Sequence, residues 1–185
     1  MNDVKPICEF VQKIIRKEIE IYNEASIQYE LAIFLRNNLP DYKIQLERNV
    51  NYFKLIKNNF IKKEIDIVIF NHDKTQKSAI EIKFPTNGQY PEQMFSFCKD
   101  IKFLEQLKNK GFSNNVFICF ANDERFWNGN AEENTIYRFF RKSEPITGLI
   151  QKPTGGKDEK FHIEGSYVAK WQPIDNLVKH FIIQV

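Results

Sequence analysis

The sequence predicts a mixed α/β fold, in which helices flank a central mixed β-sheet, and three observations indicate it. Two segments rich in β-branched and aromatic residues, 64–70 and 79–84, are separated by a polar stretch, which is typical of adjacent strands joined by a loop. A third segment, 116–120, is wholly apolar, as expected of a strand buried on both faces of a mixed sheet. Elsewhere apolar residues recur at helical spacing, which predicts the flanking helices.

The first half of the chain is expected to begin with two helices. Helical spacing of apolar residues predicts an amphipathic helix over 4–22 and a second helix over 26–39, stopped by Pro40. The alternation in 42–50 predicts a strand. Residues 51–61 continue either as another strand or as a lysine-rich hairpin arm.

The second half is expected to hold a long helix and further strands. A helix over 92–110 has one apolar side, and Gly111 provides a plausible end for it. Residues 131–142 read as helical, and strands are expected around 161–163 and 166–171.

Composition favours a single domain over all 185 residues, with 42% hydrophobic and 28% charged residues and no break or flexible linker. A net charge of +3 is too small to prove a nucleic-acid partner.

Cys8, Cys98 and Cys119 are widely spaced and odd in number, which favours buried reduced thiols over disulfides or a zinc site. The chain shows no signal peptide and no apolar run long enough for a membrane span, so a soluble, cytoplasmic protein is expected.

Three charged residues interrupt the two strand-like segments. Asp66 lies in Glu64-Ile65-Asp66-Ile67, and Glu81 and Lys83 lie in Ile80-Glu81-Ile82-Lys83. Since side chains alternate across a strand, Glu81 and Lys83 share one face, and an antiparallel pairing would bring Asp66 beside them. Carboxylates so placed repel one another in an apolar setting unless a cation or phosphate joins them, which outlines a site for a hard metal ion.

The order of these elements resembles the PD-(D/E)XK nuclease superfamily, which has the restriction-endonuclease-like fold. The similarity spans roughly residues 26–121, leaving an N-terminal helix and a C-terminal α/β extension outside this core. In that family an acidic residue precedes a Glu-x-Lys or Asp-x-Lys on the next strand, matched here by Asp66 and by Glu81-Ile82-Lys83. Glu30 matches the family's N-terminal helical Glu. Ile65 stands where the family often has Pro, which leaves the subfamily open.

The resemblance implies a Mg²⁺-dependent endodeoxyribonuclease of restriction, repair or phage-defence type, in which Mn²⁺ can substitute. Asp66, Glu81 and the backbone carbonyl of Ile82 would hold the metal ion, and Glu30 would reach a metal-bound water or a second ion. Lys83, expected to stay charged beside two carboxylates, would position the attacking water or the phosphate. DNA is the expected partner, and the family's habit implies a homodimer that cuts both strands.

Three polar residues are candidates for contacting the substrate backbone, because the family often places such residues near it: Gln45, Gln93 and Lys99.

Several readings without catalysis remain open. Asp66, Glu81 and Lys83 could instead form a salt-bridge ladder on an exposed sheet face, and Glu30 could be a solvated helix residue. A non-catalytic nucleic-acid-binding or protein-interaction module on the same fold is the alternative function. A set of lysines can be read as a phosphate-contact patch or, more commonly, as a solvated edge that blocks aggregation: Lys54, Lys57, Lys62 and Lys63.

Overall fold

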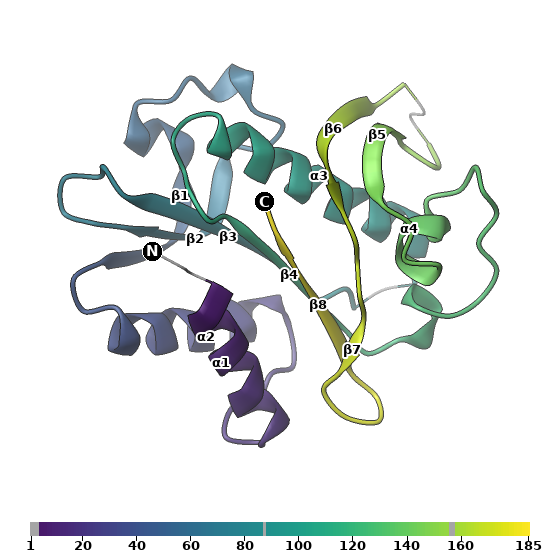
Figure 1. The fold of residues 1–185 in the computed structure, drawn as a ribbon, viewed down its shortest axis with the longest axis horizontal. Helices are drawn as coiled ribbons and strands as arrows, with labels where there is room; N and C mark the ends of the chain where they lie inside the picture. The colour runs from purple at the N-terminus through teal and green to yellow at the C-terminus, as the bar shows by residue number, and fades with distance from the viewer. Residues whose placement is uncertain (1–3, 87, 156–157) are drawn as a thin grey trace.

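A computed structural model describes residues 4–86, 88–155 and 158–185. Its centre is a six-stranded sheet in the order β1-β2-β3-β4-β8-β7 (Figure 1). β3 and β4 run parallel and the other neighbours pair antiparallel, so the sheet is mixed, as predicted. The strands are β1 (Lys43–Asn49), β2 (Glu64–Phe70), β3 (Lys77–Lys83), β4 (Val116–Ala121), β7 (Gln172–Pro173) and β8 (Lys179–Gln184).

Helices cover both faces of this sheet. α1 (Val4–Ile15) and α2 (Glu24–Asn38) lie on one side, and α3 (Tyr90–Lys108) crosses the other (Figure 1). Alternate strand residues feed the two resulting cores, as the period of two in a strand requires. Ile67, Ile69, Ile80, Ile82 and Ile118 pack with α1 and α2, whereas Val68, Phe70, Ala79, Phe117 and Cys119 pack with α3.

The C-terminal part of the chain completes the sheet and encloses α3. β8 pairs with β4 over its whole length, which leaves β4 buried between two neighbours. A second, two-stranded sheet of β5 (Ile146–Gln151) and β6 (Lys160–Tyr167) packs against α3 beside the short helix α4 (Tyr137–Arg141) (Figure 1). α3 is therefore buried on more than the one side predicted from its sequence.

The N-terminal elements differ from the prediction at their ends. α1 stops at Ile15 rather than near Tyr22, and Lys17 just beyond it adopts a left-handed conformation with φ of 61°. α2 begins at Glu24 rather than Ser26, because Asn23 and Ser26 form a reciprocal capping box. Residues 51–61 form neither a strand nor a hairpin arm, since two short 3-10 turns occupy most of this stretch.

The C-terminal predictions hold only in part. The predicted helix over 131–142 shortens to α4. The predicted strand around 161–163 is confirmed as part of β6, which also includes the first two residues of the predicted strand over 166–171 and ends at Tyr167. β5 and β8 have no counterpart among the predicted elements. The predicted strand at 116–120 and the helix ending before Gly111 are confirmed, and Gly111 has the positive φ of 83° typical of a helix C-terminus.

The cysteine prediction is correct for two residues. Cys98 and Cys119 are buried free thiols, but Cys8 lies exposed on α1.

Over the described part of the chain, no helix combines the length and apolar character that crossing a membrane requires.

Candidate functional site

The site lies where β2 and β3 part. The β2–β3 ladder reaches only as far as Ile67 and Ile80, and the next pair of residues is Asp66 and Glu81. Here side chains replace ladder bonds: Asp66 Oδ2 accepts a hydrogen bond from the Ile82 amide at 2.8 Å, and Glu81 Oε1 accepts one from the Asp66 amide at 3.3 Å. Both carboxylates are buried, Asp66 at 6% exposure and Glu81 at 0%. Two acids are thus held side by side beneath α3.

α3 adds a third buried carboxylate, Asp100, and the loop before β2 adds Lys62. The Lys62 ammonium lies among all three acids, 2.8 Å from Asp100 Oδ1, 3.7 Å from Asp66 Oδ1 and in direct contact with Glu81 Oε2. Asp100 is 2% exposed, and its second oxygen, Oδ2, has no hydrogen-bond partner among the described residues. The cluster is compact and acidic, and the Lys62 ammonium contacts all three of its carboxylates.

Lys83 joins the other side of this cluster. Its ammonium lies 3.4 Å from Asp100 Oδ2, within ion-pair distance but outside hydrogen-bonding geometry, and 3.3 Å from Glu24 Oε1. Glu24, in the first turn of α2, also accepts a hydrogen bond from the Phe84 amide at 3.4 Å. The lysine of the Glu-x-Lys sequence is therefore held between two helices at the end of β3.

Burial and mutual repulsion shift the pKa values of the cluster. Burial raises the pKa of Asp66 to about 6 although Lys62 opposes it. Burial and Asp66 together raise the pKa of Glu81 well above its usual range. Burial by itself would lower the pKa of both lysines, but the carboxylates outweigh it: Glu81 and Asp100 raise that of Lys62, and Asp100 and Glu24 that of Lys83. Both lysines are consequently charged at neutral pH.

Asp66 and Glu81 lie side by side as expected, and Lys83 is linked to them through Asp100. The exposed-ladder reading is wrong because Asp66 and Glu81 are buried. Glu30 is different. It is partly exposed on α2 and forms no side-chain hydrogen bond or ion pair with any described residue, and the α2 carboxylate beside Lys83 is Glu24. The two acids are six positions apart on α2, about 9 Å along its axis. A metal role for Glu30 stays a prediction that the geometry does not favour.

The three predicted substrate contacts lie on β1 and α3. Gln45 on β1 accepts a hydrogen bond from Arg48 at 2.8 Å, and Lys99 pairs with Glu159 at 2.6 Å. Gln93 lies about two turns before Asp100, on the same side of α3. Their contact with substrate stays a prediction.

Sequence reasoning missed Lys62, Asp100 and Glu24 as members of the site. Lys62 is not a solvated edge residue: its side chain is 23% exposed and pairs with three acids, whereas Lys54 and Lys63 are exposed. Asp100 carried a usable signal, because a carboxylate beside Ile101 and one turn after Phe97 interrupts the apolar side of α3.

The donor set fits a hard divalent ion in its chemistry, because Mg²⁺ and Mn²⁺ prefer carboxylate oxygens and Asp100 Oδ2 lacks a hydrogen bond. The arrangement itself does not yet present such a site. Among the described residues no three His, Cys, Asp or Glu side chains are placed to ligate one ion, and the Lys62 ammonium lies between the acids instead. Metal binding therefore requires this ammonium to move.

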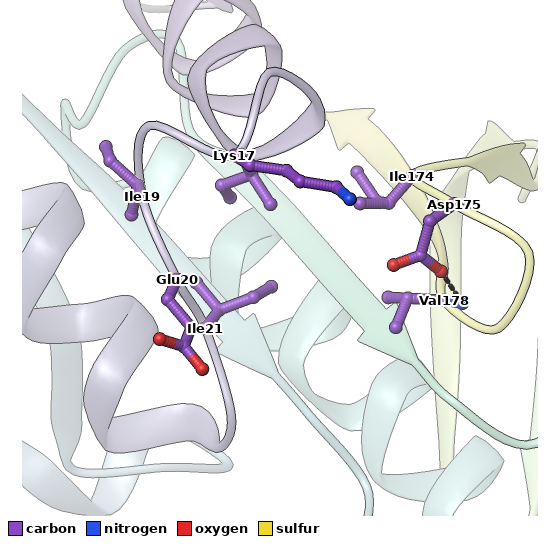
Figure 2. A pocket seen from close by; sticks show the side chains of 8 residues that line it. Lys17, Ile19, Glu20, Ile21, Ile174, Asp175 and Val178 are labelled. Carbon is purple, nitrogen blue, oxygen red and sulfur yellow. Dashed lines mark hydrogen bonds between the residues drawn. The ribbon is translucent and has the colours of Figure 1, made fainter.

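A cavity of about 440 Å³ elsewhere on the molecule contains none of these side chains. Figure 2 shows it between the loop after α1 and the turn joining β7 to β8, with Lys17 and Asp175 on one side and Glu20 on the other. Its walls are mostly isoleucine and valine, and Asp175 accepts hydrogen bonds from the Leu177 and Val178 amides, both at 2.7 Å. Asp175 thus shapes the turn.

Comparison with known proteins gives no relative: no family model, no curated protein and no solved structure matches this chain. The geometry of the acidic cluster is thus the basis for assigning a function.

Proposed function

We propose that this protein is a metal-dependent nuclease that hydrolyses DNA phosphodiester bonds, built on a restriction-endonuclease-like fold. The observation that carries the proposal is the meeting of Asp66 and Glu81 where two buried strands part, with Asp100 linking Lys83 to them. Buried acids with raised pKa values cost stability, and such groups concentrate at functional sites. An apolar pair would fill the same space without that cost.

Each residue has a role that its position supports. Asp66 and Glu81, with the Ile82 carbonyl, would hold Mg²⁺ or Mn²⁺, which when bound supplies positive charge where negative charge builds on the phosphate. Lys83, protonated and 17% exposed, donates hydrogen bonds toward a phosphate oxygen or the attacking water and so orients it. Glu24 and Asp100 position the Lys83 ammonium for this task.

One observation favours a non-catalytic module on the same fold as a second candidate. Lys62 already neutralises part of the acidic charge, as the cation of a purely structural ion network would. Such a module would bind its partner without a metal ion and would leave DNA intact.

Cleavage assays separate the two candidates. Purified protein is incubated with supercoiled, linear and single-stranded DNA in Mg²⁺ or Mn²⁺, beside EDTA and the Asp66→Ala variant. We expect cutting that requires the metal ion and disappears in the variant. Intact DNA under every condition, together with metal-independent DNA affinity, would move the assignment to the binding module.

A further inference from the structure

We propose that Lys62 competes with the metal ion. Its ammonium closes the acidic cluster in the metal-free protein, and a divalent ion that binds Asp66, Glu81 and Asp100 displaces this ammonium. This inference rests on the proposed nuclease function and adds two residues to it, a lysine that regulates metal loading and Asp100 as a further ligand.

The placement of Lys62 is that of a removable cation. Its ammonium contacts the three acids, yet its side chain keeps 23% exposure and so has a route to solvent. Neighbouring backbone groups hold the loop in place, since the Ile61 amide donates to Gln106 at 2.9 Å and the Lys63 carbonyl accepts from Val50 at 2.9 Å. Rotation of the Lys62 side chain alone therefore opens the cluster without breaking these bonds.

Asp100 provides a second, independent observation. It is 2% exposed, and Oδ2 is a buried acceptor without a hydrogen bond, which is costly unless another group uses it. Its other oxygen lies 2.8 Å from the Lys62 ammonium. When the Lys62 ammonium leaves, Oδ1 of Asp100 is open to a cation, and Oδ2, which lies 3.4 Å from the Lys83 ammonium, has no hydrogen bond to break.

Charge balance favours the exchange. Asp66, Glu81 and Asp100 carry three negative charges when ionised, against which Lys62 and Lys83 supply two positive charges. A divalent ion in place of the Lys62 ammonium supplies one more positive charge to the same acids, and the displaced ammonium regains its hydration.

Titration calorimetry with Mn²⁺ alone, without DNA, tests this exchange. We expect Lys62→Met to bind Mn²⁺ at least tenfold more tightly than the wild type, and Asp100→Asn at least tenfold more weakly. Lys102→Met is the matched control, since Lys102 also pairs with a buried acid of α3, Glu105, at 3.2 Å but lies outside the cluster. Its Mn²⁺ affinity should equal that of the wild type.

Thermal unfolding with and without Mn²⁺ covers the case in which Lys62→Met folds poorly. Three acids left without this ammonium destabilise the metal-free variant, and Mn²⁺ should then raise its Tm by more than it raises that of the wild type. Equal Mn²⁺ affinities and equal Tm increments for the wild type and Lys62→Met would overturn the proposal while leaving metal-dependent cleavage standing. Absence of Mn²⁺ binding in every variant would overturn the metal centre as well.

Discussion

Glu81→Gln is expected to lower the rate of metal-dependent DNA cleavage by about 10³-fold in a protein that still folds. The amide has the volume of the carboxylate and its oxygen can still accept the hydrogen bond from the Asp66 amide, but it lacks the charge that a metal ion requires. Because burial and Asp66 raise the pKa of Glu81, its ionised form costs stability at neutral pH. The amide NH2 then faces the Lys62 ammonium, and this lost contact offsets the gain, so the free energy of unfolding of the metal-free variant should change by less than about 2 kcal/mol.

Glu105→Gln is the matched control, because Glu105 is another buried acid beneath the C-terminal sheet. It is 5% exposed and accepts hydrogen bonds from the amides of Glu164 and Gly165, the latter at 2.7 Å, and from Tyr167 at 3.2 Å. Losing the charged acceptor should cost about 1–3 kcal/mol of unfolding free energy and leave cleavage near the wild-type rate. Single-turnover cleavage and urea denaturation of both variants decide the matter, and equal cleavage rates for Glu81→Gln and the wild type would refute the assigned role.

Phe97→Ala is expected to lower the free energy of unfolding by about 3–5 kcal/mol, a large part of a typical domain's stability. Phe97 is fully buried, and its ring lies 6.0 Å from that of Phe117 in β4, 5.5 Å from Phe140 in α4 and 6.5 Å from Phe181 in β8. One side chain of α3 therefore joins the central strand to elements from the C-terminal part of the chain.

Urea denaturation measures this loss, with Phe161→Ala as its control. Phe161 is only partly buried and its ring packs against that of Phe95 with 5.3 Å between centroids, so a loss of about 1 kcal/mol is expected there. A loss of about 1 kcal/mol or less for Phe97→Ala as well would show that Phe97 does not join the main sheet to the C-terminal elements.

The central hairpin could be predicted from sequence because its signals are local. The alternation around Asp66 and Glu81 fixes which side chains share a face, and the apolar run of β4 leaves few alternatives to a buried strand. Antiparallel pairing then brings the two acids together, as the structure confirms. The pairing of these two acids was predictable because two neighbouring strands determine it by themselves.

The rest depends on contacts between segments distant in the sequence. Glu24 reaches Lys83 only because the capping box starts α2 two residues before Ser26, and Lys62 turns inward from a loop without a regular pattern. β8 pairs with β4 across a long connection whose path periodicity does not specify. Choosing Glu30 as the helical acid relied on the family resemblance, and local capping placed Glu24 there instead.

The most direct test of the metal centre is a crystal structure of the protein with Mn²⁺, read from the anomalous scattering of the ion. We expect an anomalous peak bounded by Asp66, Glu81 and Asp100, with the Lys62 ammonium moved away from all three. Crystals soaked at saturating Mn²⁺ that show no peak at the cluster, with Lys62 still between the acids, would contradict a metal-dependent nuclease and identify the cluster as a structural ion network.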